Sequence, residues 1–153
     1  MRALIQRVRK ARVMVDGAEV GSCGCGLLIL LGVGEDDTEL EAKRLWQKIS
    51  RLRIFADEHG KTNLSLADVG GEVLVVSQFT LYADCRRGNR PSFAHAAPPE
   101  LGESLYERFC LLAKADVSHV GMGVFGADMQ VELVNDGPFT VWIDTTELAR
   151  PRK

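Results

Sequence analysis

The sequence lacks a hydrophobic run long enough to cross a membrane, and its first residues do not have the pattern expected of a secretory signal peptide. A spanning helix needs roughly 20 apolar residues, whereas the apolar stretch 26–33 has only the length of a strand. Residues 1–7 do not contain the apolar core of a signal peptide. With 46% hydrophobic and 26% charged residues, the chain has the composition of a soluble globular protein. We therefore expect one cytoplasmic domain, spanning residues 1–153.

The cysteines and histidines are too few and too scattered for a recognisable metal site or disulfide framework. Cys23 and Cys25 form a C-x-C pair without a second pair, and Cys85 and Cys110 stand alone. The three histidines lie far from the C-x-C pair in the sequence. In a cytoplasmic protein these thiols are expected to be reduced. The pattern predicts no metal.

The chain also lacks an excess of positive charge. A net charge of −2 argues against a broad nucleic-acid-binding surface. The basic residues are nevertheless clustered, first before any acid at Arg2, Arg7, Arg9, Lys10 and Arg12, and again at Arg86, Arg87 and Arg90. Each cluster is either a solvated face or a local contact for the phosphates of one nucleic-acid end. The sequence leaves both interpretations open.

Apolar patterns predict several strands. Residues 2–9 and 11–15 are typical of strands, and Asp16-Gly17 predicts a tight hairpin into residues 18–21. The continuous runs 27–33 and 72–79 predict buried strands. A short strand is expected near residues 53–55. The last two strands, about 128–134 and 139–145, flank Asn135-Asp136-Gly137-Pro138.

Two main helices are expected. Apolar residues at helical spacing after the capping candidates 36–38 predict an amphipathic helix over residues 38–51. Pro98-Pro99 is typical of the start of a second helix, preceded by an irregular segment over 84–97. No repeat or linker is visible. The predicted fold is a single α/β domain with a mixed or antiparallel, barrel-like β-sheet packed with two main helices.

The first motif is Ser77-Gln78-Phe79-Thr80, which directly follows the apolar strand 73–76. A loop that leaves a strand end can expose consecutive N–H groups, and such groups can hold a developing oxyanion. The alternative is that Ser77 and Thr80 are ordinary polar positions of the strand. No G-x-S-x-G sequence surrounds Ser77 and no histidine stands out as its base, so a serine triad is not supported.

The second motif is Asn135-Asp136-Gly137-Pro138, a set of residues typical of a turn between two strands. Pro138 lacks an N–H group, and Gly137 allows another molecule to approach the backbone closely. A cis peptide bond here would point neighbouring carbonyls the same way and form a rigid pair of acceptors. The sequence does not decide between the cis and trans isomers.

Together these segments resemble the D-aminoacyl-tRNA deacylase family, the chiral-proofreading enzymes also described as D-tyrosyl-tRNA deacylases. The resemblance runs nearly end to end, and its two long motifs occur in the family's order. It is carried by residues 1–8, 31–33, 77–81, 88–93, 125–129 and 135–138.

The resemblance implies hydrolysis of the ester that joins a D-amino acid to the terminal adenosine of a tRNA. It also implies action on glycyl-tRNA mischarged on tRNA-Ala, because glycine has no side chain to exclude. Gly137 and Pro138 would form a cis-proline element that enters the active site of the partner subunit in a homodimer. Its carbonyls would hold the substrate's α-amino group. An L side chain would meet backbone atoms, and a D side chain would point outward.

By the same resemblance, Ser77, Gln78, Phe79 and Thr80 would line the catalytic pocket, with Phe125 and Met129 nearby as substrate-binding residues. The N–H groups near Phe79 and Thr80 would stabilise the oxyanion. Thr80 is the nucleophile by residue type, but a threonine without a base is poorly activated. We therefore expect attack by water assisted by the ribose 2′-hydroxyl. No metal or organic cofactor is implied.

The chain departs from the family at Phe139, where a smaller apolar residue such as valine is usual, and this affects the fine shape of the pocket. A related subfamily has a trans Gly-Pro and a changed first motif; Ser77 and Phe79 place this chain in the D-specific branch. The implied partner is the 3′ end of a tRNA, with no DNA and no membrane. Two rival hypotheses are a non-catalytic module that binds the tRNA end and a general hydrolase of small esters.

Overall fold

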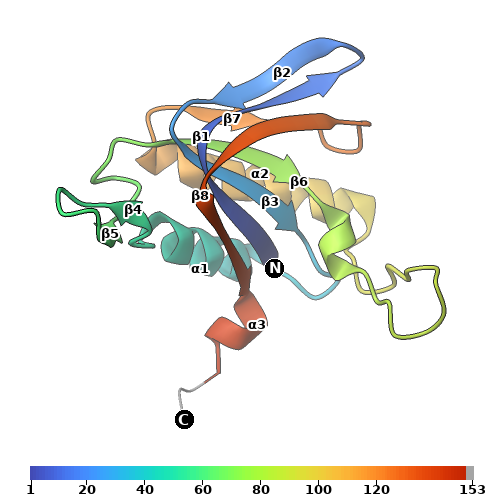
Figure 1. The fold of residues 1–153 in the computed structure, drawn as a ribbon. Coiled ribbons are helices and arrows are strands. Elements are labelled where there is room, and N and C mark those ends of the chain that lie inside the picture. The colour runs from blue at the N-terminus through green and yellow to red at the C-terminus, as the bar shows by residue number, and fades with distance from the viewer. Residues whose placement is uncertain (151–153) are drawn as a thin grey trace.

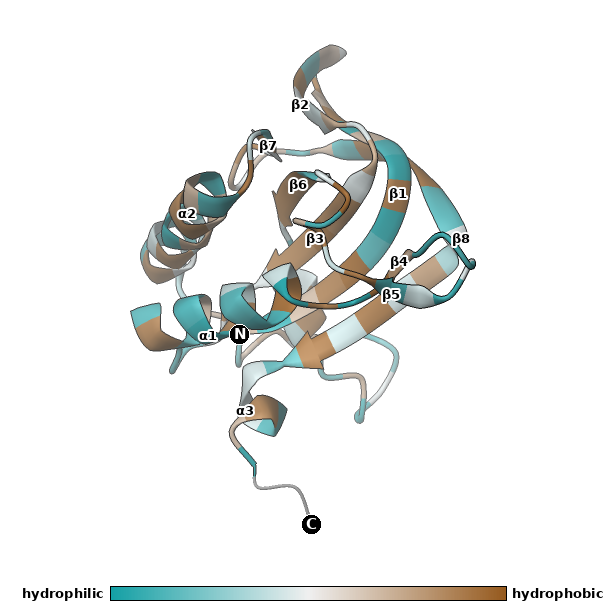
Figure 2. Cartoon of the chain, turned by 90° about the vertical axis from the view of Figure 1, so that its left-hand side faces the viewer, coloured by the Kyte–Doolittle hydropathy of each residue, from teal (hydrophilic) through white to brown (hydrophobic). Residues whose placement is uncertain are grey.

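The computed structural model describes residues 1–150, so the last three residues of the expected domain 1–153 lie outside the described part. A strongly bent β-sheet forms one layer, and helices α1 (Glu39–Ser50) and α2 (Pro99–Asp116) pack on the same side of it, as Figures 1 and 2 show. None of the helices in residues 1–150 is long and apolar enough to cross a membrane. The predicted α/β fold class and its two main helices are confirmed.

The sheet is built around one long strand, β1 (Arg2–Val15). Its first half pairs with β3 (Gly26–Gly32) and its second half with β2 (Ala18–Cys23), in both cases antiparallel. β8 (Gln130–Asp144) runs antiparallel along the other edge of β1. β3 continues in parallel to β6 (Glu72–Ser77), and β6 to β7 (Val120–Met122). The sheet is therefore mixed, as predicted, but residues 2–15 form one strand and not two.

Two glycines allow the sheet to close nearly into a barrel. A Cβ atom on Gly21 of β2 would lie 2.2 Å from the carbonyl oxygen of Met122 in β7. A Cβ atom on Gly121 would lie 2.3 Å from the carbonyl oxygen of Ser22. Only glycine tolerates such an approach of one backbone to another. β7 was not predicted, because Gly121 in isolation is typical of a chain break.

The buried strands have apolar residues on both faces, which explains their continuous hydrophobic runs. One face of β3 and β6 packs against α1 and α2 and forms the main core with β1. The opposite face forms a smaller core inside the curve of the sheet. Fully buried side chains of the main core include Met1, Ile5, Leu27, Ile29, Leu31, Leu45, Ile49 and Phe109.

The shorter elements mostly follow the predicted pattern. Thr38 caps α1 and Glu41 completes a capping box; the hydrogen bond from the Thr38 hydroxyl holds the pKa of Glu41 below its ordinary value. The strand expected near 53–55 is β4 (Phe55–Ala56), which pairs with β5 (Thr62–Leu64). Helix α3 (Thr145–Leu148), capped by Asp144, was not predicted.

Candidate active site

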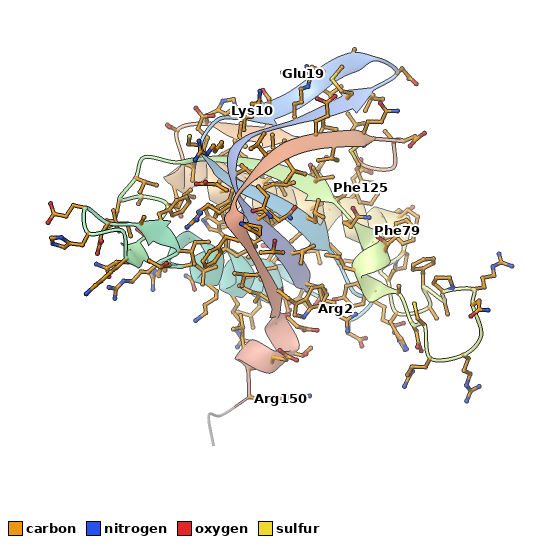
Figure 3. The ribbon with its side chains drawn as sticks, viewed as in Figure 1. Arg2, Lys10, Glu19, Phe79, Phe125 and Arg150 are labelled. Atoms are coloured by element: carbon orange, nitrogen blue, oxygen red, sulfur yellow. The ribbon has the colours of Figure 1, made fainter. Side chains whose placement is uncertain are left out.

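The first motif lies where β6 leaves the sheet, and it lines a pocket of about 590 Å³. β6 ends at Ser77, two residues earlier than predicted, and the chain turns into the short 3-10 helix η1 (Phe79–Tyr82). Figure 3 shows the side chains of Phe79 and Phe125 near this turn. The lining is mostly apolar and consists of Val76, Ser77, Gln78, Phe79, Phe93, Ala96, Ala97, Pro99, Phe125, Gly126, Ala127, Met129 and Val131.

The turn leaves two neighbouring N–H groups without partners. The N–H group of Gln78 donates to the carbonyl oxygen of Leu31 (2.7 Å) and closes the pairing of β6 with β3. The next two N–H groups, of Phe79 and Thr80, open η1, where a helix has no internal acceptors for them. Within residues 1–150 neither donates a hydrogen bond. A pair of free main-chain donors at the edge of an apolar pocket suits a developing oxyanion.

The hydroxyl groups of the motif have no activating base. The Thr80 hydroxyl accepts a hydrogen bond from the side-chain amide of Gln78 and is exposed. Thr80 does not line the pocket with its neighbours. In the described part of the chain, no histidine, lysine or carboxylate hydrogen-bonds to Ser77 or Thr80. The geometry therefore favours catalysis by backbone donors over a serine or threonine nucleophile.

The far end of η1 is anchored by side chains that do not line the pocket. The Tyr82 hydroxyl donates to Asp37 (3.2 Å), and Arg2 donates to the carbonyl oxygen of Leu81 (2.9 Å). Burial, together with the neighbouring Asp37 carboxylate, raises the pKa of Tyr82 above its ordinary value. These contacts fix the direction in which η1 leaves the strand, and with it the positions of its first two N–H groups.

Phe125 and Met129, the substrate-binding residues that the resemblance implied, form another wall of the pocket. Two glycines make room for them: a Cβ atom on Gly102 of α2 would lie 3.1 Å from the Phe125 ring, and one on Gly123 would lie 2.7 Å from Met129 Sδ. The Tyr106 ring lies 6.1 Å from the Phe125 ring, centroid to centroid. Packing against α2 and against the residue that follows β7 therefore sets the positions of Phe125 and Met129.

The irregular segment 84–97 also contributes to the pocket, which the sequence did not predict. Phe93, Ala96 and Ala97 from this segment line the pocket. The Phe93 ring meets Phe79 edge to face, with centroids 5.0 Å apart. Phe93 belongs to the stretch 88–93 that contributes to the family resemblance, but no local pattern in the sequence assigns it to the pocket.

The second motif is not a turn between two strands, and the prediction of two final strands is wrong. β8 is a single strand, and both of its halves pair with β1. Gln6 pairs with Thr140 and Val8 pairs with Asn135, so residues 136–139 lie opposite Arg7 alone. These four residues form a large bulge within the strand. The Gly137-Pro138 peptide bond is cis.

Asn135 bridges the two ends of the bulge, and Arg7 of β1 contacts it. The Asn135 side chain accepts from the N–H group of Phe139 (2.9 Å). Arg7 donates to the carbonyl oxygens of Asp136 (2.9 Å) and Ile54 (2.6 Å), and its guanidinium lies 4.8 Å from the centroid of the Phe139 ring. Phe139, the residue that departs from the family pattern, therefore packs on Arg7. These contacts fix the bulge relative to β1.

The structure does not bring the two motifs together within one chain. Gly137 and Pro138 are exposed. Across residues 1–150, neither belongs to the pocket that the first motif, Phe125 and Met129 line. The bulge is therefore exposed and separate from the pocket of its own chain.

No cluster of three or more histidine, cysteine, aspartate or glutamate side chains in the described residues could hold a metal ion. Cys23 and Cys110 are buried, and burial raises their pKa values to about 11 and about 12. Cys25 and Cys85 are exposed, and no cysteine lines the pocket among residues 1–150. The pocket offers backbone and apolar contacts, not thiol chemistry.

Comparison with known proteins places these features in context. The family model described as D-Tyr-tRNA(Tyr) deacylase matches residues 4–144. A D-aminoacyl-tRNA deacylase of Roseiflexus castenholzii is 59% identical over 152 residues, covering 99% of this chain and 97% of the relative. One of Thermotoga petrophila is 56% identical over 148 residues, covering 97% of this chain and 99% of the relative.

Two solved structures share the fold. The first, titled c-Myc DNA Unwinding Element Binding Protein, has a TM-score of 0.89 and 39% identity, covering 94% of this chain and 98% of that one. The second, titled as a probable eukaryotic D-amino acid tRNA deacylase, has a TM-score of 0.82 at 18% identity, covering 93% of this chain and 97% of that one. At 18% identity the second comparison concerns the fold alone.

Proposed function

Since the chain belongs to the D-Tyr-tRNA(Tyr) deacylase family, whose members hydrolyse the aminoacyl-tRNA ester bond, we propose that it selects D-aminoacyl groups with main-chain atoms at a site shared by two subunits. The observation that carries the proposal is a pair of N–H groups that have no acceptor among residues 1–150, beside an apolar pocket whose described lining includes no base. Ser77, Gln78, Phe79 and Thr80 form its catalytic edge, and Phe125 and Met129 bind the substrate.

The proposed chemistry follows from these groups. The apolar pocket accepts the terminal adenosine, and the substrate carbonyl points toward the N–H groups of Phe79 and Thr80. As water attacks, the carbonyl oxygen becomes negatively charged, and the two donors stabilise that charge in place. The leaving group is the ribose oxygen of the tRNA. Because neither motif hydroxyl is paired with a base, the neighbouring 2′-hydroxyl of the substrate assists the water.

The bulge of a second copy of the chain distinguishes D-aminoacyl groups from L-aminoacyl groups. Gly137 and Pro138 of one subunit enter the pocket of its partner, and their carbonyl oxygens accept hydrogen bonds from the substrate's α-ammonium group. An L side chain would then collide with the backbone, whereas a D side chain points outward. A glycyl group has no side chain that could collide with the backbone, so glycyl-tRNA mischarged on tRNA-Ala is also a substrate. The exposed position of the bulge and its absence from its own pocket support this arrangement.

The assembly that completes both pockets is a homodimer with a two-fold axis, because the bulge of each subunit then enters the pocket of the other. The proposed partner is the 3′ end of a cytoplasmic tRNA that carries a D-amino acid or glycine. Metal ions, organic cofactors, DNA and membranes have no part in the proposal.

The proposal predicts release of D-tyrosine from D-tyrosyl-tRNA and of glycine from glycyl-tRNA-Ala, with release of L-tyrosine slower by at least about 100-fold. Steric rejection by rigid backbone is the reason for this ratio. The measurement is single-turnover release from each charged tRNA with enzyme in excess. Binding without turnover would favour the non-catalytic rival. Equal hydrolysis of an ester that has no tRNA would favour the general esterase.

A further inference from the structure

The segment after η1 forms a protruding loop next to the pocket. Asp84 and Ser92 exchange two main-chain hydrogen bonds of 2.8 and 3.0 Å, which close the base of the loop. Residues 85–91 form its exposed tip. The residue after the closure, Phe93, lines the pocket and contacts Phe79. Figure 1 shows this loop extending beyond η1, away from the sheet.

The tip has positive charge that the protein itself does not neutralise. Arg86 is paired with Asp84 by two hydrogen bonds, of 2.8 and 2.6 Å. Arg87 and Arg90 form no ion pair with any residue in the range 1–150. Both are exposed. In a chain with a net charge of −2, two free guanidinium groups beside the pocket are a local departure from the overall charge.

The nearby acids are already engaged. Asp84 is used by Arg86, and Glu35 lies 2.8 Å from His95 Nδ1. The His95–Glu35 contact, together with the Gly34–Ala96 bridge, ties the later part of the segment to the end of β3. The loop is therefore fixed at its base and on its pocket side, and its free charges are at the tip.

We propose that Arg87 and Arg90 bind backbone phosphates of the tRNA acceptor end while the terminal adenosine occupies the pocket. This inference rests on the proposed function. Half of the seven-residue tip reaches at most about 12 Å from its closed base, and the RNA backbone carries one phosphate per nucleotide. The contacts therefore fall within the first few nucleotides before the terminal adenosine. They carry no sequence information and hold the RNA in register.

The test compares the wild type with the double variant Arg87→Gln, Arg90→Gln on two substrates. One substrate is D-tyrosyl-tRNA and the other is the D-tyrosyl ester of adenosine alone. We expect kcat/KM for the tRNA to fall about tenfold, because two phosphate contacts are lost. For the adenosine ester it should stay within about twofold. The slope of log kcat/KM against log salt for the tRNA should become shallower by about 1.4 to 1.8.

Two further variants make the outcome specific. Arg87→Lys with Arg90→Lys keeps both charges and should keep the salt slope of the wild type. Lys48→Gln with Arg51→Gln removes the same amount of charge from the exposed C-terminal end of α1, which lies at the opposite end of the molecule from the loop in Figure 1. This control should leave both the tRNA rate and the salt slope unchanged.

The possible failures are distinguishable. If the wild type releases nothing from D-tyrosyl-tRNA, the proposed function fails and this inference fails with it. If the wild type is active but the Arg87→Gln, Arg90→Gln variant keeps its tRNA rate and salt slope, the phosphate contact alone is wrong. An equal loss on both substrates would also overturn it, because the adenosine ester has no preceding phosphate.

Discussion

Gly137→Ala is expected to lower kcat/KM for D-aminoacyl-tRNA by at least about 100-fold. Gly137 has a φ of +140°, and a Cβ atom there would lie 3.0 Å from the Phe139 nitrogen and 3.1 Å from Arg7 Nη2. The bulge must shift to relieve these contacts, and a displacement of about 1 Å in a positioning element costs about 100-fold in rate. The measurement is single-turnover release of D-tyrosine.

A matched control separates this effect from the general strain of alanine at a positive φ. Gly60, in the turn between β4 and β5, has a φ of +74°, and a Cβ atom there would meet nothing within 4 Å. Gly60→Ala should therefore keep the wild-type rate within about twofold. A Gly137→Ala variant with the rate of the Gly60→Ala control would show that the bulge does not take part in the site.

Replacing the 2′-hydroxyl of the terminal adenosine with hydrogen is expected to slow deacylation by about 100- to 10,000-fold, which is the range of general acid–base catalysis. The expectation follows from the absence of a base at Ser77 and Thr80 among residues 1–150. Hydrolysis of D-tyrosyl-tRNA ending in 2′-deoxyadenosine, at saturating enzyme, measures the effect directly.

The companion variant is Thr80→Ala, which removes the hydroxyl and keeps the N–H group. It should retain activity within about fivefold, since in the described residues 1–150 the Thr80 hydroxyl hydrogen-bonds to the Gln78 side-chain amide and to no base. A Thr80→Ala variant that binds D-tyrosyl-tRNA normally but never turns it over would instead identify Thr80 as a covalent nucleophile.

The sequence predicted the parts of the fold that depend on local pattern. The strands predicted over 27–33 and 72–79 have continuous apolar runs because both of their faces are covered, although the second strand ends at Ser77. The Thr38 cap and the helix start at Pro99 follow from local backbone chemistry. β7 was not predicted from the sequence. It contains Gly121 because its backbone lies against β2, and no local pattern reveals such a tertiary contact.

The second motif was placed correctly as a special backbone site but given the wrong local structure. Asn135, Asp136, Gly137 and Pro138 are turn residues in any local analysis. Only the register of β1 against both halves of β8 shows that the chain continues in the same direction after the bulge. The partner of that bulge, Arg7, is 129 residues away from Asp136 in the sequence, so local reasoning could not pair them.

The candidate pocket was predictable only in part. Ser77, Gln78 and Phe79 line the pocket with Phe125 and Met129, whereas Thr80 does not, and the roles of these residues in catalysis and binding stay predictions. Phe93, Ala96 and Ala97 join it because the irregular segment is folded back by the Gly34–Ala96 bridge. No periodic pattern marks such a long-range contact in the sequence.

Mixed dimers give the most direct test of a site completed by two subunits. Gly137→Ala disables the bulge, and Phe79→Pro disables the pocket because proline has no N–H group to hold the oxyanion. Each variant is expected to lose at least about 100-fold in activity as a homodimer. In a purified heterodimer of the two, a shared site pairs the intact pocket of one subunit with the intact bulge of the other, and roughly half of the wild-type activity per dimer should return. A heterodimer as inactive as both parents would show that each chain uses its own bulge, and would contradict the account.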